Sequence, residues 1–170
     1  MYRVVQFYQA LTAHVDPDEL EAVAPLLGPR GAALFQRLSH HDQRHSLNVY
    51  ATLRSWGYDQ PALLTAALLH DVGKVTGRIA LPCRILVTLL RRFSPRLLGY
   101  LERHGDIGLL RPFRIAGAHA DIGSRLVGEA GFPEEVVELV RCHHGVPLDE
   151  RWADELGEAL SVLHRADGRN

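Results

Sequence analysis

Six side chains that can bind metal ions or transfer protons lie on the apolar faces or at the ends of predicted helices: His45, His70, Asp71, His119, His143 and Asp167. His45, for example, precedes Val49 and Leu53 at steps of four and eight residues, which is the spacing of one helix face. A single histidine on such a face is usually a hydrogen-bonded core residue. Burying four imidazoles and two carboxylates together is very unfavourable unless a shared partner satisfies them. A pair of divalent metal ions does so, because imidazole nitrogen and carboxylate oxygen are ligands of first-row metals.

Two of these residues, His70 and Asp71, are adjacent and end the most apolar stretch of the chain. One helix end can therefore supply two ligands, and the Asp71 carboxylate can bridge two ions. Lys74 follows three residues later and is the single lysine among 19 basic residues. Lysine offers a compact point charge where arginine offers a planar fork. A contact with phosphate and a solvated helix end are both open interpretations of Lys74.

The elements that position these residues are predicted to be helices, because the apolar periodicity is helical nearly throughout and no stretch alternates like a strand. Breaks are expected at Asp16-Pro17, Gly28-Pro29, Gly57 to Pro61, Gly73, Ser94-Pro95, Gly105, Gly131 to Pro133 and Gly145 to Pro147. The sequence thus predicts an all-α fold, a compact bundle of about eight or nine helices. The helix from Pro61 to Asp71 is apolar on every side and should be buried at the centre. We expect one domain over residues 1–170, with helices of residues 1–40 packed on a motif-bearing core at about 41–167.

The composition excludes several classes of protein. The chain has 170 residues, 46% apolar and 23% charged, as in ordinary soluble domains. A net charge of −1 gives no indication of a stable nucleic-acid partner. No apolar run is long enough to span a bilayer, and the N-terminus lacks the apolar core of a signal peptide. Cys83 and Cys142 show no disulfide spacing, so we expect a cytoplasmic protein without a transmembrane segment.

Several of these residues resemble the signature of a known family. His45, the run Leu-Leu-His-Asp-Val-Gly-Lys that ends at Lys74, and Ala166-Asp167 resemble the His…His-Asp…Asp pattern of the HD superfamily of metal-dependent phosphohydrolases. Within it, His-Asp-Val-Gly-Lys is similar to the HDIG subgroup, with valine in place of isoleucine. The resemblance covers roughly residues 41–167 and includes five motif elements in the right order.

Two further motifs resemble the two-metal members of this family. Gly123 follows His119 at a spacing of four residues, and His143-His144 is similar to their later His-His pair. The resemblance implies that four residues hold the first metal: His45, His70, Asp71 and Asp167. A second metal would share Asp71 and take His119 and His143, with His144 as a further ligand. The two divalent ions would be Fe, Mn, Co, Ni or Zn.

The resemblance implies a hydrolase that acts on phosphate ester bonds of a nucleotide or another small phosphorylated molecule. In such sites two metals about 3.5–4 Å apart lower the pKa of a bridging water, and the metal-bridged hydroxide attacks phosphorus. Asp71 would hold both ions, and Lys74 would contact a phosphate oxygen and offset its developing charge. His144 would be either a further metal ligand or the proton donor to the leaving oxygen.

Three departures from related subgroups narrow the range of expected substrates. No Gly-Tyr-Pro segment follows His144, as it does in the members that cleave cyclic di-GMP. His41 stands where those enzymes can carry a glutamate for a third metal, and Gly73-Lys74 replaces the Glu-Asp of stringent-response hydrolases. Two other classes remain as alternatives: an HD-fold di-iron oxygenase and a non-catalytic signalling or binding module. The complete ligand set argues against the second of these.

The segment from Arg84 to Arg103 is unusual, because it carries five arginines against one glutamate, interleaved with apolar residues. This pattern fits a basic apolar lid for an anionic substrate or a peripheral membrane contact. It also fits a helical hairpin packed on the core with its arginines pointing outward, which we favour. The sequence leaves the oligomeric state open.

Overall fold

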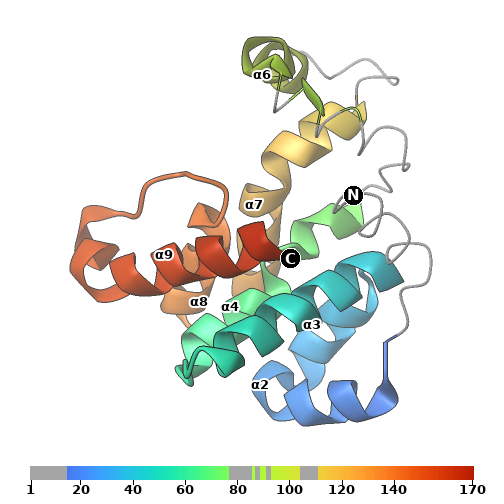
Figure 1. Ribbon diagram of the computed structural model, residues 1–170, viewed down its shortest axis with the longest axis vertical. Coiled ribbons are helices and arrows are strands. Elements are labelled where there is room, and N and C mark those ends of the chain that lie inside the picture. The colour runs from blue at the N-terminus through green and yellow to red at the C-terminus, as the bar shows by residue number, and fades with distance from the viewer. Residues whose placement is uncertain (1–14, 77–85, 87–88, 91–92, 104–110) are drawn as a thin grey trace.

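The computed structural model describes residues 15–76, 86, 89–90, 93–103 and 111–170. These residues form seven α-helices and two 3-10 helices, and none of them forms a strand (Figure 1). In chain order the elements are α2 (Pro17–Gln36), α3 (His40–Ser55), α4 (Pro61–Leu69), η1 (Val72–Thr76), α6 (Pro95–Arg103), α7 (Arg111–Glu129), α8 (Glu134–Cys142), η2 (Glu150–Trp152) and α9 (Ala153–Arg169). The predicted all-α fold is confirmed, although the seven α-helices of the described residues are slightly fewer than expected.

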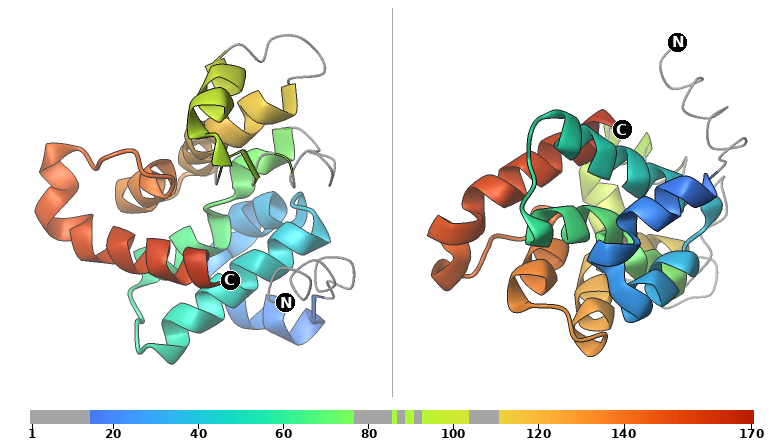
Figure 2. Two further views of the ribbon diagram at one scale, coloured as in Figure 1. Left: turned by 45° about the horizontal axis from the view of Figure 1, so that its top comes forward. Right: turned by 90° about the horizontal axis from the view of Figure 1, so that it is seen from below.

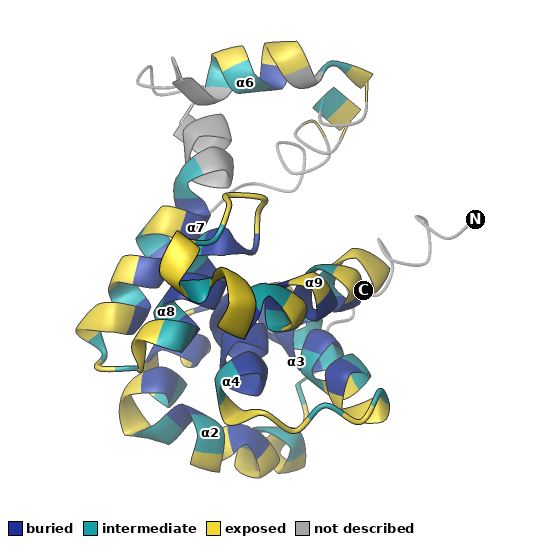
Figure 3. Cartoon of the chain, turned by 90° about the vertical axis from the view of Figure 1, so that its left-hand side faces the viewer, coloured by how far each residue is buried: buried dark blue, intermediate teal, exposed yellow. Residues whose placement is uncertain are grey.

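Helix α4 forms the centre of the core, as its apolar sequence predicts. Pro61 is its first residue, where the fixed φ and missing N–H of proline are tolerated. Every residue from Leu63 to Leu69 is buried, and α4 contacts α2, α3, α8 and α9 (Figure 3). The α-helix ends at Leu69, slightly before the expected end, with His70 as its C-cap. His70 and Asp71 therefore lie together at the end of the core helix.

Several predicted breaks coincide with observed helix boundaries. Helix α2 is kinked at Gly28, whose φ of 56° lies in the left-handed region that glycine adopts most easily. Helix α6 begins at Pro95, and α8 begins directly after Pro133, which is its N-cap. The break expected at Gly105 lies outside the described residues.

A close contact between two glycines places η1 against α7. A Cβ added to Gly73 would lie 1.9 Å from the carbonyl oxygen of His119 and 2.7 Å from the amide nitrogen of Gly123. A Cβ added to Gly123 would in turn lie 3.1 Å from the Gly73 amide nitrogen. Only glycine fits at position 73, because real Cβ atoms do not approach a backbone so closely. This contact brings Asp71, just before η1, to the part of α7 that carries His119.

Four helices bring their residues to the end of α4. Helices α3 and α9 pack against each other and against α4, whereas α7 and α8 pack against each other (Figures 1 and 2). Helix α8 also contacts α4, and η1 lies against α7. The end of α4 is therefore the place where all of these elements can contribute side chains to one site.

The arginine-rich segment is described at residues 86, 89–90 and 93–103. Helix α6 contacts α7 at a distance from α3 and α9 (Figure 1), and its Leu98 is buried. Five large apolar side chains of the segment are exposed: Leu86, Leu89, Phe93, Leu97 and Tyr100. Among the described apolar residues of the segment, some are thus buried and others exposed, so the packed hairpin that we favoured stays a prediction. A role as a lid or as a membrane contact stays a prediction.

Candidate metal centre

The structure brings all seven predicted metal ligands together at the end of α4. Six of them form two groups of three residues. Within each group, the three ligand atoms lie within 4.8 Å of one another. The first cluster is His45 on α3, His70 at the end of α4 and Asp167 on α9. The second cluster is His119 on α7 with His143 and His144, which follow α8. The seventh residue, Asp71, lies between them.

The two carboxylate oxygens of Asp71 face different clusters. Its Oδ2 lies 3.6 Å from the Nε2 of His70 in the first cluster. Its Oδ1 lies 3.6 Å from the Nε2 of His119 and 4.0 Å from the Nε2 of His143, both in the second cluster. The side chain is 2% exposed. A buried carboxylate in this position can be shared by two cations, one at each cluster.

The first cluster contains a close hydrogen-bonded pair, His45 and Asp167. The Nε2 of His45 lies 2.9 Å from the Oδ1 of Asp167, and the Nε2 of His70 lies 3.7 Å from the same oxygen. Burial lowers the pKa of His45, but its hydrogen bond to Asp167 and the nearby carboxylates outweigh burial, so the pKa is raised. Burial favours protonation of Asp167, yet the hydrogen bond from His45 holds its pKa well below the usual range. Each side chain thus favours the charged form of the other: the carboxylate favours protonated His45, and the imidazole favours ionised Asp167.

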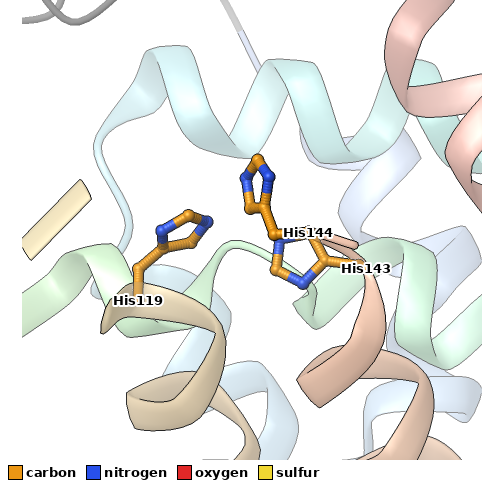
Figure 4. A group of neighbouring side chains, drawn as sticks. All are labelled: His119, His143 and His144. Carbon is orange, nitrogen blue, oxygen red and sulfur yellow. The ribbon is translucent and has the colours of Figure 1, made fainter. Parts of the chain in front are cut away.

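The second cluster is formed by three histidine rings that face one another (Figure 4). The ring centre of His144 lies 4.4 Å from that of His119 and 4.5 Å from that of His143. The ring of His143 also lies 5.1 Å from that of His70, which joins the two clusters. Burial and the neighbouring His70 hold the pKa of His143 well below its usual range. This imidazole is therefore neutral, as a metal ligand must be.

Backbone hydrogen bonds fix the tautomers of two candidate ligands, His70 and His143. The Nδ1 of His70 lies 2.9 Å from the carbonyl oxygen of Ala67, and that of His143 lies 2.6 Å from the carbonyl oxygen of Val140. A carbonyl oxygen can only accept, so Nδ1 carries the proton and Nε2 carries the lone pair. Both Nε2 atoms are buried without a hydrogen-bond partner among the described residues. A divalent cation fits these atoms, because it accepts lone pairs from imidazole and carboxylate alike.

Lys74 belongs to this charged centre and is no solvated helix end. Its Nζ contacts the Oδ2 of Asp71, lies 3.9 Å from the Oδ1 of Asp42, and the side chain is 26% exposed. Burial alone would raise the pKa of Asp71, but the Lys74 ammonium and the surrounding histidines outweigh burial. They hold the pKa of Asp71 well below its usual range, so this carboxylate stays ionised.

Sequence reasoning missed Asp42, a buried carboxylate near the Lys74 ammonium. Its side chain also bonds the hydroxyl of Ser39, the N-cap of α3, which makes it resemble an ordinary helix-capping residue. The available signal was its position three residues before His45, on the same side of α3. His144 lies in the second cluster but is exposed; its role as ligand or proton donor stays a prediction. Cys142 is a buried free thiol.

Comparison with known proteins gives one finding. A family model described as HD domain matches residues 43–168, a range that contains both clusters, Asp71 and Lys74 but not Asp42. No curated protein and no solved structure matches the chain. Among the helices that the structure describes, none has both the length and the apolar character needed to cross a membrane.

Proposed function

Since this chain belongs to the HD domain family, we propose that it is a metal-dependent hydrolase that cleaves a phosphate ester of a nucleotide or another small phosphorylated molecule. One observation carries the proposal: each carboxylate oxygen of Asp71 faces a different cluster of imidazole nitrogens. A carboxylate with ligands on both sides is what two neighbouring ions require of the residue that they share.

The proposed site holds two divalent ions. The first would be bound by the first cluster and Asp71, and the second by the second cluster and Asp71. Iron, manganese, cobalt, nickel and zinc all suit this mixture of nitrogen and oxygen ligands. When bound, such ions lower the pKa of a coordinated water and polarise the phosphoryl oxygen.

Two features of the chain suit this site to metal binding: the ionised carboxylates and the position of the proton on two of the histidine rings. Asp71 and Asp167 supply the two negative charges, and both have pKa values held below their usual ranges. His70 and His143 present lone pairs that their backbone hydrogen bonds have already oriented. His45 differs, because its raised pKa favours the protonated imidazole, which competes with metal binding.

Two residues are proposed to act on the substrate. Lys74 lies beside Asp71 and is partly exposed, so its ammonium is available to a phosphate oxygen and can offset charge that develops there. His144 is exposed at the edge of the second cluster. In that position it can donate a proton to the leaving oxygen or complete the set of ligands.

The proposal extends to the setting of the enzyme. The substrate would be a small molecule, since the net charge of −1 gives no indication of a polyanionic partner. We propose a single domain over residues 1–170, in the cytoplasm and without a stable nucleic-acid partner.

Metal analysis followed by an activity screen tests the proposal. Purified protein would be analysed for bound metals, then reloaded with each candidate ion and assayed on phosphomonoesters, nucleotides and dinucleoside polyphosphates. We expect phosphate release from at least one of these classes with at least one ion. Absence of hydrolysis under every metal, in protein that retains two ions, would contradict the proposal.

The same preparation separates the proposal from the oxygenase alternative. A di-iron oxygenase would contain iron, give an electron paramagnetic resonance signal in its mixed-valent state and consume oxygen with its substrate. A hydrolase would release phosphate without oxygen uptake. Oxygen uptake without phosphate release would favour the oxygenase.

A further inference from the structure

A partly buried ion pair outside the two clusters, Glu138–Arg141, joins the last turn of α8 to the segment that follows it. The Glu138 carboxylate accepts hydrogen bonds from Arg141, over 2.8 Å from Nε and 2.5 Å from Nη2. It also accepts from the amide of Asp149 over 3.0 Å and from the Cys142 thiol over 3.6 Å. The Glu138 side chain is 10% exposed. Its carboxylate thus links its own helix to the residue that caps η2.

The same helical turn also bonds to the backbone of Pro147. The Nη2 of Arg141 donates to the Pro147 carbonyl over 3.2 Å, and the Cys142 thiol lies 3.4 Å from the same oxygen. Residues 143–149 therefore form a loop that leaves the last turn of α8 and folds back onto it. The two ligand histidines stand at the start of this returning segment, directly after α8 (Figure 4).

Helix α9 also contacts the last turn of α8, through His164. The carbonyl oxygen of Cys142, directly before His143, accepts from the amide of Gly145 over 3.0 Å and from the Nε2 of His164 over 3.2 Å. Gly145 has a φ of 87°, a conformation that favours glycine. The backbone around His143 and His144 is thus fixed by contacts on both sides.

The charge of Glu138 matters to these contacts. Its hydrogen bond from Arg141 outweighs burial and lowers the pKa of Glu138 to about 2, so the carboxylate is ionised at neutral pH. The pair is partly buried, because the Glu138 side chain is 10% exposed and that of Arg141 is 31% exposed. A second pair, Glu134–Arg151, joins the same helix to η2 at 3.3 Å with side chains 72% and 62% exposed. Exposed pairs of this kind contribute little, so it is a matched control.

We propose that Glu138 is a positioning residue for the second metal site: through Arg141 and the Asp149 amide it fixes the turn that carries His143 and His144. This inference rests on the proposed two-metal site and adds a residue that lies outside both clusters. Loss of Glu138 should weaken the second site, because supporting partners of metal ligands commonly change affinity by about 10–100-fold. The first site should be unaffected, since its ligands come from α3, α9 and the end of α4.

The test is a titration of the metal-free, full-length protein with Mn²⁺ and with Co²⁺, which reports the affinity of each site. Glu138→Gln keeps the size of the side chain and an accepting oxygen but removes the charge. We expect the affinity of one site to fall about tenfold or more, and that of the other to stay within about twofold. Glu134→Gln, on the same helix, should change neither site.

A further variant identifies the site that is affected. His119→Ala should retain only the first site, so its remaining ion should bind equally well with and without Glu138→Gln. Equal losses at both sites of the otherwise intact protein, or no loss at either, would overturn the inference. Wild-type protein that binds fewer than two ions would instead contradict the proposed metal site, so the two failures are distinguishable.

Arg141→Lys replaces Glu138→Gln if that variant does not fold. Lysine keeps a positive charge beside Glu138 but cannot bond both Glu138 and the Pro147 carbonyl through one planar fork. Selective weakening of the second site supports the positioning role. Equal weakening of both sites by Arg141→Lys, or no weakening of either, overturns the positioning role.

Discussion

The Oδ1 of Asp71 lies 3.6 Å from the Nε2 of His119. Close to this pair, the backbone of η1 touches that of α7 at Gly73. Gly73 lies two residues after Asp71, against the His119 carbonyl oxygen and the Gly123 amide. The distance between the Asp71 carboxylate and the His119 imidazole is therefore set by contact between main chains. Side-chain rearrangement can do little to compensate for a change at this point.

Gly73→Ala should damage both the fold and the metal site. The added methyl would lie 1.9 Å from the His119 carbonyl oxygen, so η1 must move away from α7. We expect a loss of about 3 kcal/mol or more in the free energy of unfolding and a reduced metal content, measured by denaturation and elemental analysis.

Gly157→Ala is the control for this substitution. It lies on α9, nothing lies within 4 Å of the added methyl, and alanine favours a helix over glycine by up to about 1 kcal/mol. It should therefore leave metal content unchanged and stability equal or higher. A Gly73→Ala variant that behaves in the same way would show that the contact with α7 does not set the site.

Lys74→Ala should lower turnover without removing metal. The Lys74 ammonium contacts Asp71 and lies 3.9 Å from Asp42, but it cannot itself bind a cation. We expect unchanged metal content and a fall in kcat on the order of 10²-fold, because charge stabilisation at phosphate is lost. Lys74→Arg keeps the charge with a different shape and should retain more activity than alanine. If Lys74→Ala instead loses its metals, the ammonium organises the Asp71 carboxylate rather than the substrate.

The stabilising effect of Glu138 should depend on pH. Its pKa is lowered from 4.5 to about 2 in the folded protein, so the unfolded state binds more protons between these values. The stabilisation is therefore fully present above about pH 4.5 and is lost as the pH falls toward 2. In urea denaturation of metal-free protein, the stability difference between wild type and Glu138→Gln should shrink from neutral pH to about pH 3. A difference that stays constant over this range would mean that the carboxylate is not held ionised by its partners.

The fold and the grouping of the candidate ligands could be predicted from the sequence because they depend on local patterns. The apolar helix that starts at Pro61 has to be buried, and His70 and Asp71 stand at its end. His45 shares a helix face with buried Val49 and Leu53. The structure brings all of the predicted ligands together because each one ends or lines an element that packs on α4 or η1.

The supporting contacts could not be predicted, because they depend on how distant segments meet. Glu138 and Arg141 form a pair three residues apart, which in sequence is typical of a solvated helix face. Glu138 is buried because the residues up to Asp149 fold back onto α8. The need for glycine at Gly73 likewise follows from the docking of η1 on α7, which has no local signature.

Asp71 is the residue assigned to both ions, so its replacement tests the two-metal site most directly. Asn preserves the size of the side chain and one coordinating oxygen, but it removes the charge that offsets the repulsion between two dications. Its effect should therefore exceed that of losing a ligand of one ion alone. His119→Ala, which removes a ligand of the second cluster only, is the comparison.

The decisive measurement is the number of metal ions per chain in wild type, His119→Ala and Asp71→Asn, prepared identically and checked for helical content by circular dichroism. We predict about two, about one and close to none, respectively, with no hydrolysis by Asp71→Asn and little change in the helical signal. Asp71→Asn protein that retains two tightly bound ions and near-normal turnover would contradict the shared carboxylate on which the proposed mechanism depends.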